Sequence, residues 1–174
     1  MKREENYKYN TAIAEIANWG YSSYVRTHYN IKPHKADKMV QNLLKYTDLI
    51  QGVYFTLEDD SNIYGGGTND SFVRNINRSI NHMHLLFALE KNTDITRIRR
   101  SVNRRVKDGG IIRTVSQIVT GEQALRETIV QGLDVNQKAL GNIEPIRNNT
   151  EIVKYINKHM SNPQAHHNYF FKDN

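Results

Sequence analysis

Apolar side chains recur at three- and four-residue steps along much of this chain, and such spacing places them on one face of an α-helix. The clearest case is residues 35–50, where the inward positions would be Ala36, Met39, Val40, Leu43, Thr47 and Ile50. A helix with one apolar face buries that face against the rest of the protein. The 174 residues suffice for one domain with its own core, so the spacing predicts a helical domain.

The same reasoning assigns the chain to the mainly α class, as a compact domain of five to six helices. Besides 35–50, the predicted helices cover residues 11–28, 70–90, 95–107, 120–131 and 150–160. A short β-hairpin is expected near residues 53–64, and residues 111–115 fit either a strand or a helix. Residues 1–160 are predicted to form a single helical domain, and residues 161–174 an irregular C-terminal docking tail.

The basic residues are distributed unevenly. Residues 97–107 hold six lysines and arginines and no acid, while the whole chain has 24 basic and 18 acidic residues. Without this segment the chain carries no net charge. Such a dense cationic segment needs an anionic partner or free access to solvent, and nucleic acid is the commonest partner of this kind.

On a helix, Ile95, Ile98, Val102 and Val106 would face inward and leave the cations outside, where guanidinium groups suit phosphates and guanine edges. The approach to this helix resembles a helix-turn-helix, with Ala88, Asn92 and Ile98 at the small, turn and apolar positions. The predicted nucleic-acid-binding residues are Thr96, Arg97, Arg99, Arg100, Arg104, Arg105, Lys107 and Arg113. The alternatives are an arginine-rich helix that binds RNA, and a solvated face paired with acids such as Glu58. Phe87, Ile98 and Val102 are expected to share one packed cluster.

No catalytic constellation or metal site is predicted. His82 and His84 are two residues apart, and on a helix their side chains would point about 160° away from each other. The acids from Glu58 to Asp60 fit a solvated turn better than a cation site. Neither a cofactor nor an enzymatic activity is therefore expected.

The sequence thus predicts a non-enzymatic nucleic-acid-binding protein, most plausibly a small DNA-binding regulator of phage or mobile-element type, with DNA favoured over RNA. The alternative is a structural subunit of a nucleic-acid-containing particle, such as a phage head-to-tail connector ring. The aromatic residues Tyr169, Phe170 and Phe171 are predicted to dock on a neighbouring subunit, which implies a homo-oligomer. With no cysteine and no long apolar run, the chain is expected to be cytoplasmic or virion-internal, without a membrane partner.

Overall fold

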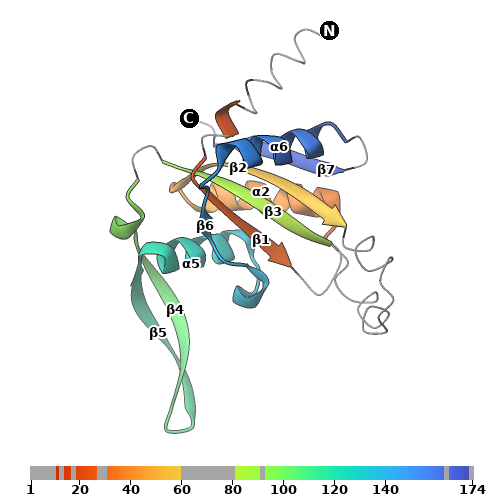
Figure 1. Cartoon of the computed structure of the whole chain (residues 1–174). Helices are drawn as coiled ribbons and strands as arrows, with labels where there is room; N and C mark the ends of the chain where they lie inside the picture. The colour runs from red at the N-terminus through yellow and green to blue at the C-terminus, as the bar shows by residue number, and fades with distance from the viewer. Residues whose placement is uncertain are drawn as a thin grey trace, which may run out of the picture.

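The fold is a five-stranded antiparallel sheet with helices on both faces and a separate two-stranded hairpin (Figure 1). The computed structural model describes residues 11, 14–16, 19–26, 31–59, 81–90, 93–162 and 165–172. The large sheet has the order β6-β1-β3-β2-β7, so β3 is its central strand. Its strands are β1 (Tyr21–Arg26), β2 (Ile50–Asp59), β3 (Asn81–Leu89), β6 (Glu144–Pro145) and β7 (His166–Phe171).

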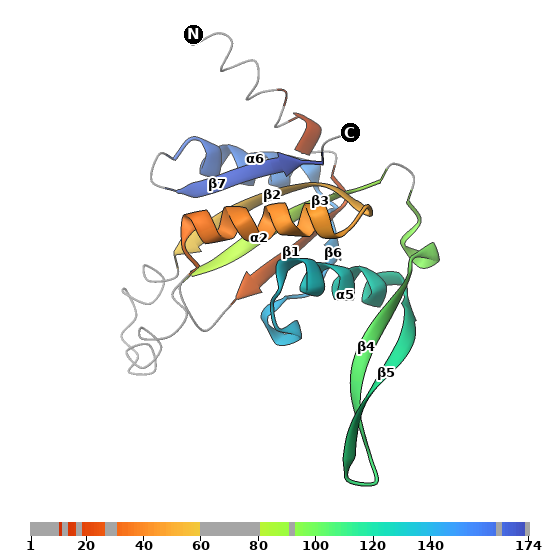
Figure 2. The same ribbon diagram turned by 180° about the vertical axis from the view of Figure 1, so that it is seen from behind.

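Two helices cover one face of this sheet, and one helix covers the other. Figure 2 shows α2 (Pro33–Tyr46) and α5 (Gly121–Leu133) side by side in front of the sheet, with α6 (Asn149–Met160) behind it. Because side chains alternate between the faces of a strand, each strand contributes to both layers. On β3, Met83, Leu85 and Phe87 face α2 and α5, whereas Leu86 faces α6.

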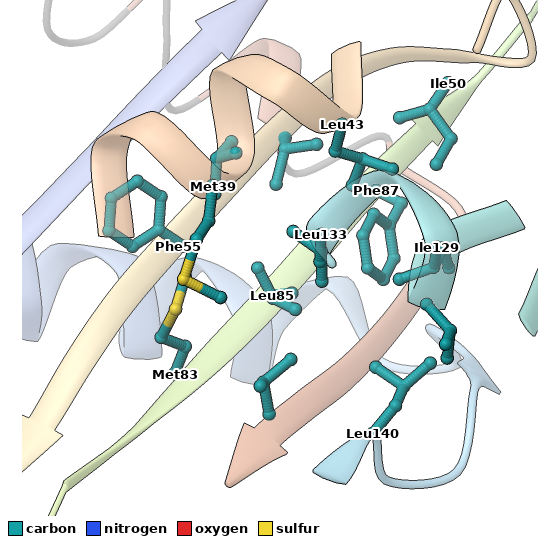
Figure 3. Close-up of a cluster of buried hydrophobic side chains, with 14 of the residues drawn as sticks. Met39, Leu43, Ile50, Phe55, Met83, Leu85, Phe87, Ile129, Leu133 and Leu140 are labelled. Atoms are coloured by element: carbon teal, nitrogen blue, oxygen red, sulfur yellow. The ribbon is translucent and has the colours of Figure 1, made fainter. Parts of the chain in front are cut away.

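The larger core lies between the sheet and the pair α2 and α5 (Figure 3). Phe55, Leu85 and Phe87 are fully buried there and pack with Leu43 of α2 and Ile129 of α5. The smaller core on the opposite face joins Tyr54 and Leu86 to Ile156 of α6. The protein is therefore a three-layer α/β/α arrangement.

Strands β4 (Arg99–Asp108) and β5 (Ile111–Thr120) form the hairpin, which extends away from the sheet in both views (Figures 1 and 2). Its turn is the pair Gly109 and Gly110, with φ values of 57° and 82°. Both values lie in the left-handed region, which a two-residue hairpin turn of type I′ requires. One 3-10 turn, η1 (Ile95–Arg97), precedes the hairpin, and another, η2 (Gln137–Ala139), follows α5.

The prediction of a mainly α fold is wrong: in the described part of the chain, seven strands form two antiparallel sheets. The helices expected at 35–50, 120–131 and 150–160 are present as α2, α5 and α6. Thr120 is the N-cap residue of α5, although its side chain makes no capping hydrogen bond. The helices expected at 11–28, 70–90 and 95–107 are instead largely the strands β1, β3 and β4 wherever residues are described.

Four-residue spacing explains these errors. A step of four fits a helix, but it also returns to the same face of a strand, because strand side chains alternate with a period of two. Ile98, Val102 and Val106 are spaced in this way, as are Met83 and Phe87. Phe87 also lies in a different cluster from Ile98 and Val102, so the expected shared cluster is wrong.

Two further expectations concern the segment 53–64 and the tail. The first strand expected at 53–57 lies within β2, whereas residues 60–80 fall outside the described part of the chain. The tail expected to be irregular contains β7, which pairs with β2 of the same chain from Gly52↔Phe171 to Leu57↔His166. Among the described residues, no helix combines the length and apolar composition needed to cross a membrane.

Candidate active site

A cluster of one carboxylate and two imidazoles lies on the sheet face that α6 covers. Glu58 is near the end of β2 and pairs with His82 at the start of β3, while Thr56 pairs with His84. Because the side chains of a strand alternate in direction, His82 and His84 point to the same face, and Glu58 joins them from the neighbouring strand.

The three side chains converge closely enough to hold one ion. The Nε2 atoms of His82 and His84 are 2.8 Å apart, and each lies 3.4 Å from Oε2 of Glu58. A cation bound at about 2.0–2.1 Å would hold its ligand atoms roughly 2.9–3.4 Å apart, which matches this spacing. Two imidazoles and one carboxylate form a donor set typical of divalent transition metals. The residues therefore fit such an ion.

The expectation that His82 and His84 point away from each other is wrong, because they lie on the strand β3 and not on a helix. On a helix, residues two apart point in nearly opposite directions, whereas on β3 the two rings lie side by side with centroids 4.7 Å apart. His82 is buried and His84 is partly exposed, so the cluster borders the surface.

Helix α6 brings a tyrosine and a third histidine to the same carboxylate. The hydroxyl of Tyr155 donates to Oε1 of Glu58 at 2.8 Å and lies 2.8 Å from Oγ1 of Thr56. One helical turn later, Nε2 of His159 is 3.2 Å from the same Oε1, and its ring contacts the Tyr155 ring at 4.5 Å. Glu58 thus links the two histidines on β3 to the tyrosine on α6.

The surroundings shift the ionisation of these groups. Hydrogen bonds from His82 and His84 hold the pKa of Glu58 well below its usual range, so this side chain is a carboxylate at neutral pH. Burial, assisted by the negative charge of Glu58, raises the pKa of Tyr155 well above its usual range. Burial also lowers the pKa of His159, although Glu58 opposes this shift. At neutral pH the Tyr155 phenol is therefore protonated, and Glu58, which accepts its hydrogen bond, is negatively charged.

The residues predicted to bind nucleic acid lie on and beside the β4–β5 hairpin, not on a helix. Thr96 and Arg97 belong to η1, Arg113 lies on β5, and the other five lie on β4: Arg99, Arg100, Arg104, Arg105 and Lys107. The helix-turn-helix is therefore wrong, since β4 replaces its second helix.

Strand alternation divides the cations of β4 between two faces of the hairpin. Arg100 and Arg104 share a face with the buried residue Val102, which docks the base of the hairpin near α5. Arg99, Arg105 and Lys107 lie on the opposite face, where all three are exposed. We call this the outer face of the hairpin.

Several of the predicted cations have partners within the chain. Arg104 contacts the buried Glu127 at 3.2 Å, and Arg100 donates to Thr47 at 3.1 Å. Arg113 pairs with Asp108 at 2.9 Å, while Arg97 lies 3.7 Å from Asp94, which also accepts hydrogen bonds from Thr96. Within the described residues, Arg105 and Lys107 have no acidic partner. The internal pairing weighed as an alternative is thus present, but with Glu127, Asp108 and Asp94 in place of Glu58.

The aromatic tail residues lie on β7, at the edge of the sheet. Phe170 packs against the larger core and Tyr169 against the smaller one. Phe171 is 39% exposed and meets the Trp19 ring edge-on at 5.6 Å. The tail therefore contributes a strand and two core contacts to its own chain.

Sequence reasoning considered Glu58, His82 and His84 as ligands but rejected them, and it did not consider Tyr155. The available signal was the run from His82 to Leu85, in which polar and apolar residues alternate as in a half-buried strand. Reading it as a strand places both histidines on one face. In comparisons with known proteins, no family model, no curated protein and no solved structure matches this chain.

Proposed function

We propose that this protein is a metal-dependent enzyme that cleaves a nucleic-acid strand by transferring a phosphoryl group to Tyr155. One observation carries the proposal: a single carboxylate, Glu58, faces two histidines through one oxygen and the Tyr155 hydroxyl through the other. This geometry puts a potential nucleophile beside a potential Lewis-acid position.

Glu58, His82 and His84 would hold the metal ion. A divalent cation with only three protein ligands keeps positions open for substrate, and it would polarise a phosphate oxygen and stabilise the charge that develops on it. The partly exposed His84 marks the side from which a phosphodiester can approach.

Tyr155 is placed to attack the phosphorus. Its hydroxyl is oriented by Thr56 and Glu58, both at 2.8 Å. As the bond between Oη of Tyr155 and phosphorus forms, one bond from phosphorus to a sugar oxygen breaks. The phenol proton passes to water, and the departing sugar oxygen gains a proton from water. Glu58 accepts the hydrogen bond that orients the phenol, but its lowered pKa makes it a weak base. Tyrosine is an established type of covalent nucleophile, and its raised pKa explains why it needs an adjacent acceptor.

The outer face of the hairpin supports nucleic acid as the substrate. Arg99, Arg105 and Lys107 project there, beside the polar side chains of Ser101 and Asn103. A two-stranded ribbon with cations on one face suits a phosphate backbone and fits the major groove of a duplex. The hairpin would hold the nucleic acid while the cluster under α6 acts on one strand.

The proposal is tested with fluorescently labelled single-stranded DNA and with Mn²⁺ or Mg²⁺. The wild-type chain should cleave the strand and retain the label through denaturing electrophoresis, as a covalent adduct. Tyr155→Phe should form neither the cleaved strand nor the covalent adduct. His84→Ala should reduce the cleavage rate by two or more orders of magnitude.

Tyr46→Phe is the matched control, since Tyr46 is an exposed tyrosine on α2 that bonds to Gln131 outside the cluster. It should leave both products unchanged. Cleavage that persists in Tyr155→Phe, or metal-dependent cleavage without an adduct, would overturn the assignment of Tyr155 as the nucleophile.

A non-enzymatic DNA-binding regulator is the second candidate, and the exposed cations on the hairpin favour it. In that case Arg105→Ala with Lys107→Ala would weaken DNA binding, while the wild-type chain would leave every strand intact with either metal. We do not carry the connector-ring expectation further, because the aromatic tail that motivated it lies in the sheet of its own chain.

A further inference from the structure

A recess adjoins the candidate site beside His84 and Tyr155. Its floor includes Ser22 of β1 and Leu86 of β3, one wall is formed by Glu151, Ile152 and Tyr155 of α6, and the facing wall includes Glu144 of β6. The cavity has a volume of about 490 Å³, within the range of small-molecule sites. His84 and Tyr155 line this cavity and also belong to the cluster around Glu58. A chemical group attached to a phosphate at that cluster would therefore lie next to the cavity.

The charges of the lining exclude a phosphate as the occupant. Among the described residues around the cavity there is no lysine or arginine, while Glu144 and Glu151 contribute two carboxylates. Lys154 of α6 lies 3.6 Å from Glu151, but both side chains are largely exposed, 70% and 66%, so solvent screens this ion pair. A phosphodiester would be repelled here, whereas a neutral group that donates hydrogen bonds would be attracted.

The apolar part of the lining suits a flat ring. The Tyr155 ring, Ile152 and Leu86 are carbon surfaces on which a base can stack, and Asn142 and Ser22 add polar contacts beside the carboxylates. Enzymes that act on nucleic acids read an unpaired base in this way, with stacking on its faces and hydrogen bonds at its edge.

On the basis of the function proposed above, we propose that this cavity binds the nucleobase next to the phosphate that Tyr155 attacks, and that it prefers a base with an exocyclic amino group. Adenine, cytosine and guanine carry such a group as a hydrogen-bond donor, whereas thymine presents a carbonyl oxygen in its place. A carboxylate at Glu144 or Glu151 accepts from the amino group and repels the carbonyl.

The test measures binding rather than cleavage. Labelled oligonucleotides of deoxyadenosine, deoxycytidine and thymidine are titrated with the full chain carrying Tyr155→Phe, without added metal, and followed by fluorescence anisotropy. The adenine and cytosine strands should bind about five-fold or more tightly than the thymine strand. Adding Glu144→Gln and Glu151→Gln should bring the ratio of the dissociation constants close to one.

Glu122→Gln is the matched control, because Glu122 is an exposed acid on α5, across the sheet from α6. It changes the net charge without touching the cavity, so all affinities should shift together and the ratio should stay the same. Ile152→Trp fills the cavity and should weaken the binding of the adenine and cytosine strands most. Circular dichroism verifies the fold of each variant, and the double glutamine variant decides the matter if Ile152→Trp does not fold.

A ratio that is unchanged in the double glutamine variant would overturn the proposal, as would equal binding of all three strands by the Tyr155→Phe chain. This outcome is distinct from failure of the proposed function. If no strand is cleaved by the wild-type chain but the base preference depends on Glu144 and Glu151, the cavity binds bases in a protein that is not a nuclease. If cleavage depends on Tyr155 but the preference does not depend on the two glutamates, only the inference about the cavity fails.

Discussion

At the residue scale, Glu58 is the group on which the candidate site depends. Its Oε2 atom faces both histidines and its Oε1 atom accepts from Tyr155, so one side chain couples a possible ion to a possible nucleophile. Neutralising it would weaken one proposed metal ligand and the charged hydrogen-bond acceptor of the phenol together, whereas Thr56→Ala removes only one of the two groups that orient the phenol.

Metal binding should be visible as thermal stability. A ligand that binds only the folded state stabilises it by about 2.7 kcal/mol at a free concentration one hundred times its dissociation constant. We expect Mn²⁺ to raise the melting temperature of the wild-type chain, and to lose most of this effect in Glu58→Gln and His82→Ala. His34→Ala is the control, because His34 is an exposed histidine of α2 on the opposite face of the sheet. An equal rise in all four proteins would show that Mn²⁺ acts elsewhere.

The histidine pair also shows how far sequence reasoning reached at this scale. Residue type alone pointed to His82 and His84 as candidate ligands, but the direction of their side chains depends on the secondary structure. Tyr155 and Glu58 are 97 positions apart in the sequence and meet only because α6 packs on the sheet. No local pattern predicts such a contact.

At the element scale, the hairpin separates neighbouring arginines into two roles. Arg104→Ala would leave the buried Glu127 with only its hydrogen bonds from Gln123 and Gln137, so we expect a loss of about 1–2 kcal/mol in the free energy of unfolding. Arg105→Ala should change stability by less than about 0.5 kcal/mol. Urea denaturation of the two variants measures both values.

The outer-face cations should affect nucleic-acid affinity instead. If Arg105 and Lys107 each meet a phosphate, changing both to alanine should reduce the slope of log affinity against log salt by about two units on duplex DNA. A slope that is unchanged in the folded double variant would place the nucleic acid elsewhere on the protein.

Strand β7 should make stability sensitive to mild acid. Burial, helped by the nearby His166 and His159, lowers the pKa of His167 in the folded chain. The unfolded chain therefore takes up the proton first, so stability falls as the pH drops below about 6.5, the ordinary value, and continues to fall until the folded-state pKa is reached. Between pH 7 and pH 5, the melting temperature of His167→Gln should fall by less than that of the wild type. A parallel decline in both proteins would assign the acid sensitivity to other groups.

The type of an element could be predicted where the spacing of its apolar residues fits a helix but not a strand, or a strand but not a helix. The apolar positions of α2 include steps of three as well as four, and steps of three fit no single face of a strand. At the start of the hairpin, Ile98, Val102 and Val106 are each four residues apart, and a helix and a strand both accommodate this spacing. The step of three from Ile95 to Ile98 lies before β4, in the 3-10 turn η1 and the residue that follows it. The Gly109-Gly110 pair, followed by a run rich in β-branched residues from Ile111 to Thr120, was the overlooked signal for a hairpin.

At the scale of the whole molecule, the hairpin is closed at its base. The backbone N–H of Gly121 donates to the carbonyl of Ile98 at 3.1 Å, so the chain leaves the body and returns at nearly the same point. Replacing residues 100–119 with a short glycine-rich turn should therefore keep the five-stranded sheet and the metal-dependent rise in melting temperature, while DNA affinity falls at least ten-fold. Calorimetry and anisotropy measure the two effects. Loss of cooperative unfolding in the shortened chain would show that the hairpin is part of the folding unit.

The position of α6 near the end of the chain has a consequence for biosynthesis. A nascent chain has its two histidines and Glu58 well before Tyr155 is made, and β7, which pairs with β2 beside the site, follows later still. Because translation proceeds from the N-terminus at about 5–20 residues per second, the strands that carry Glu58, His82 and His84 are complete seconds before the helix that bears Tyr155. If Tyr155 is the nucleophile proposed above, a translation product that stops before α6 would contain Glu58, His82 and His84 but would be unable to attack a nucleic acid.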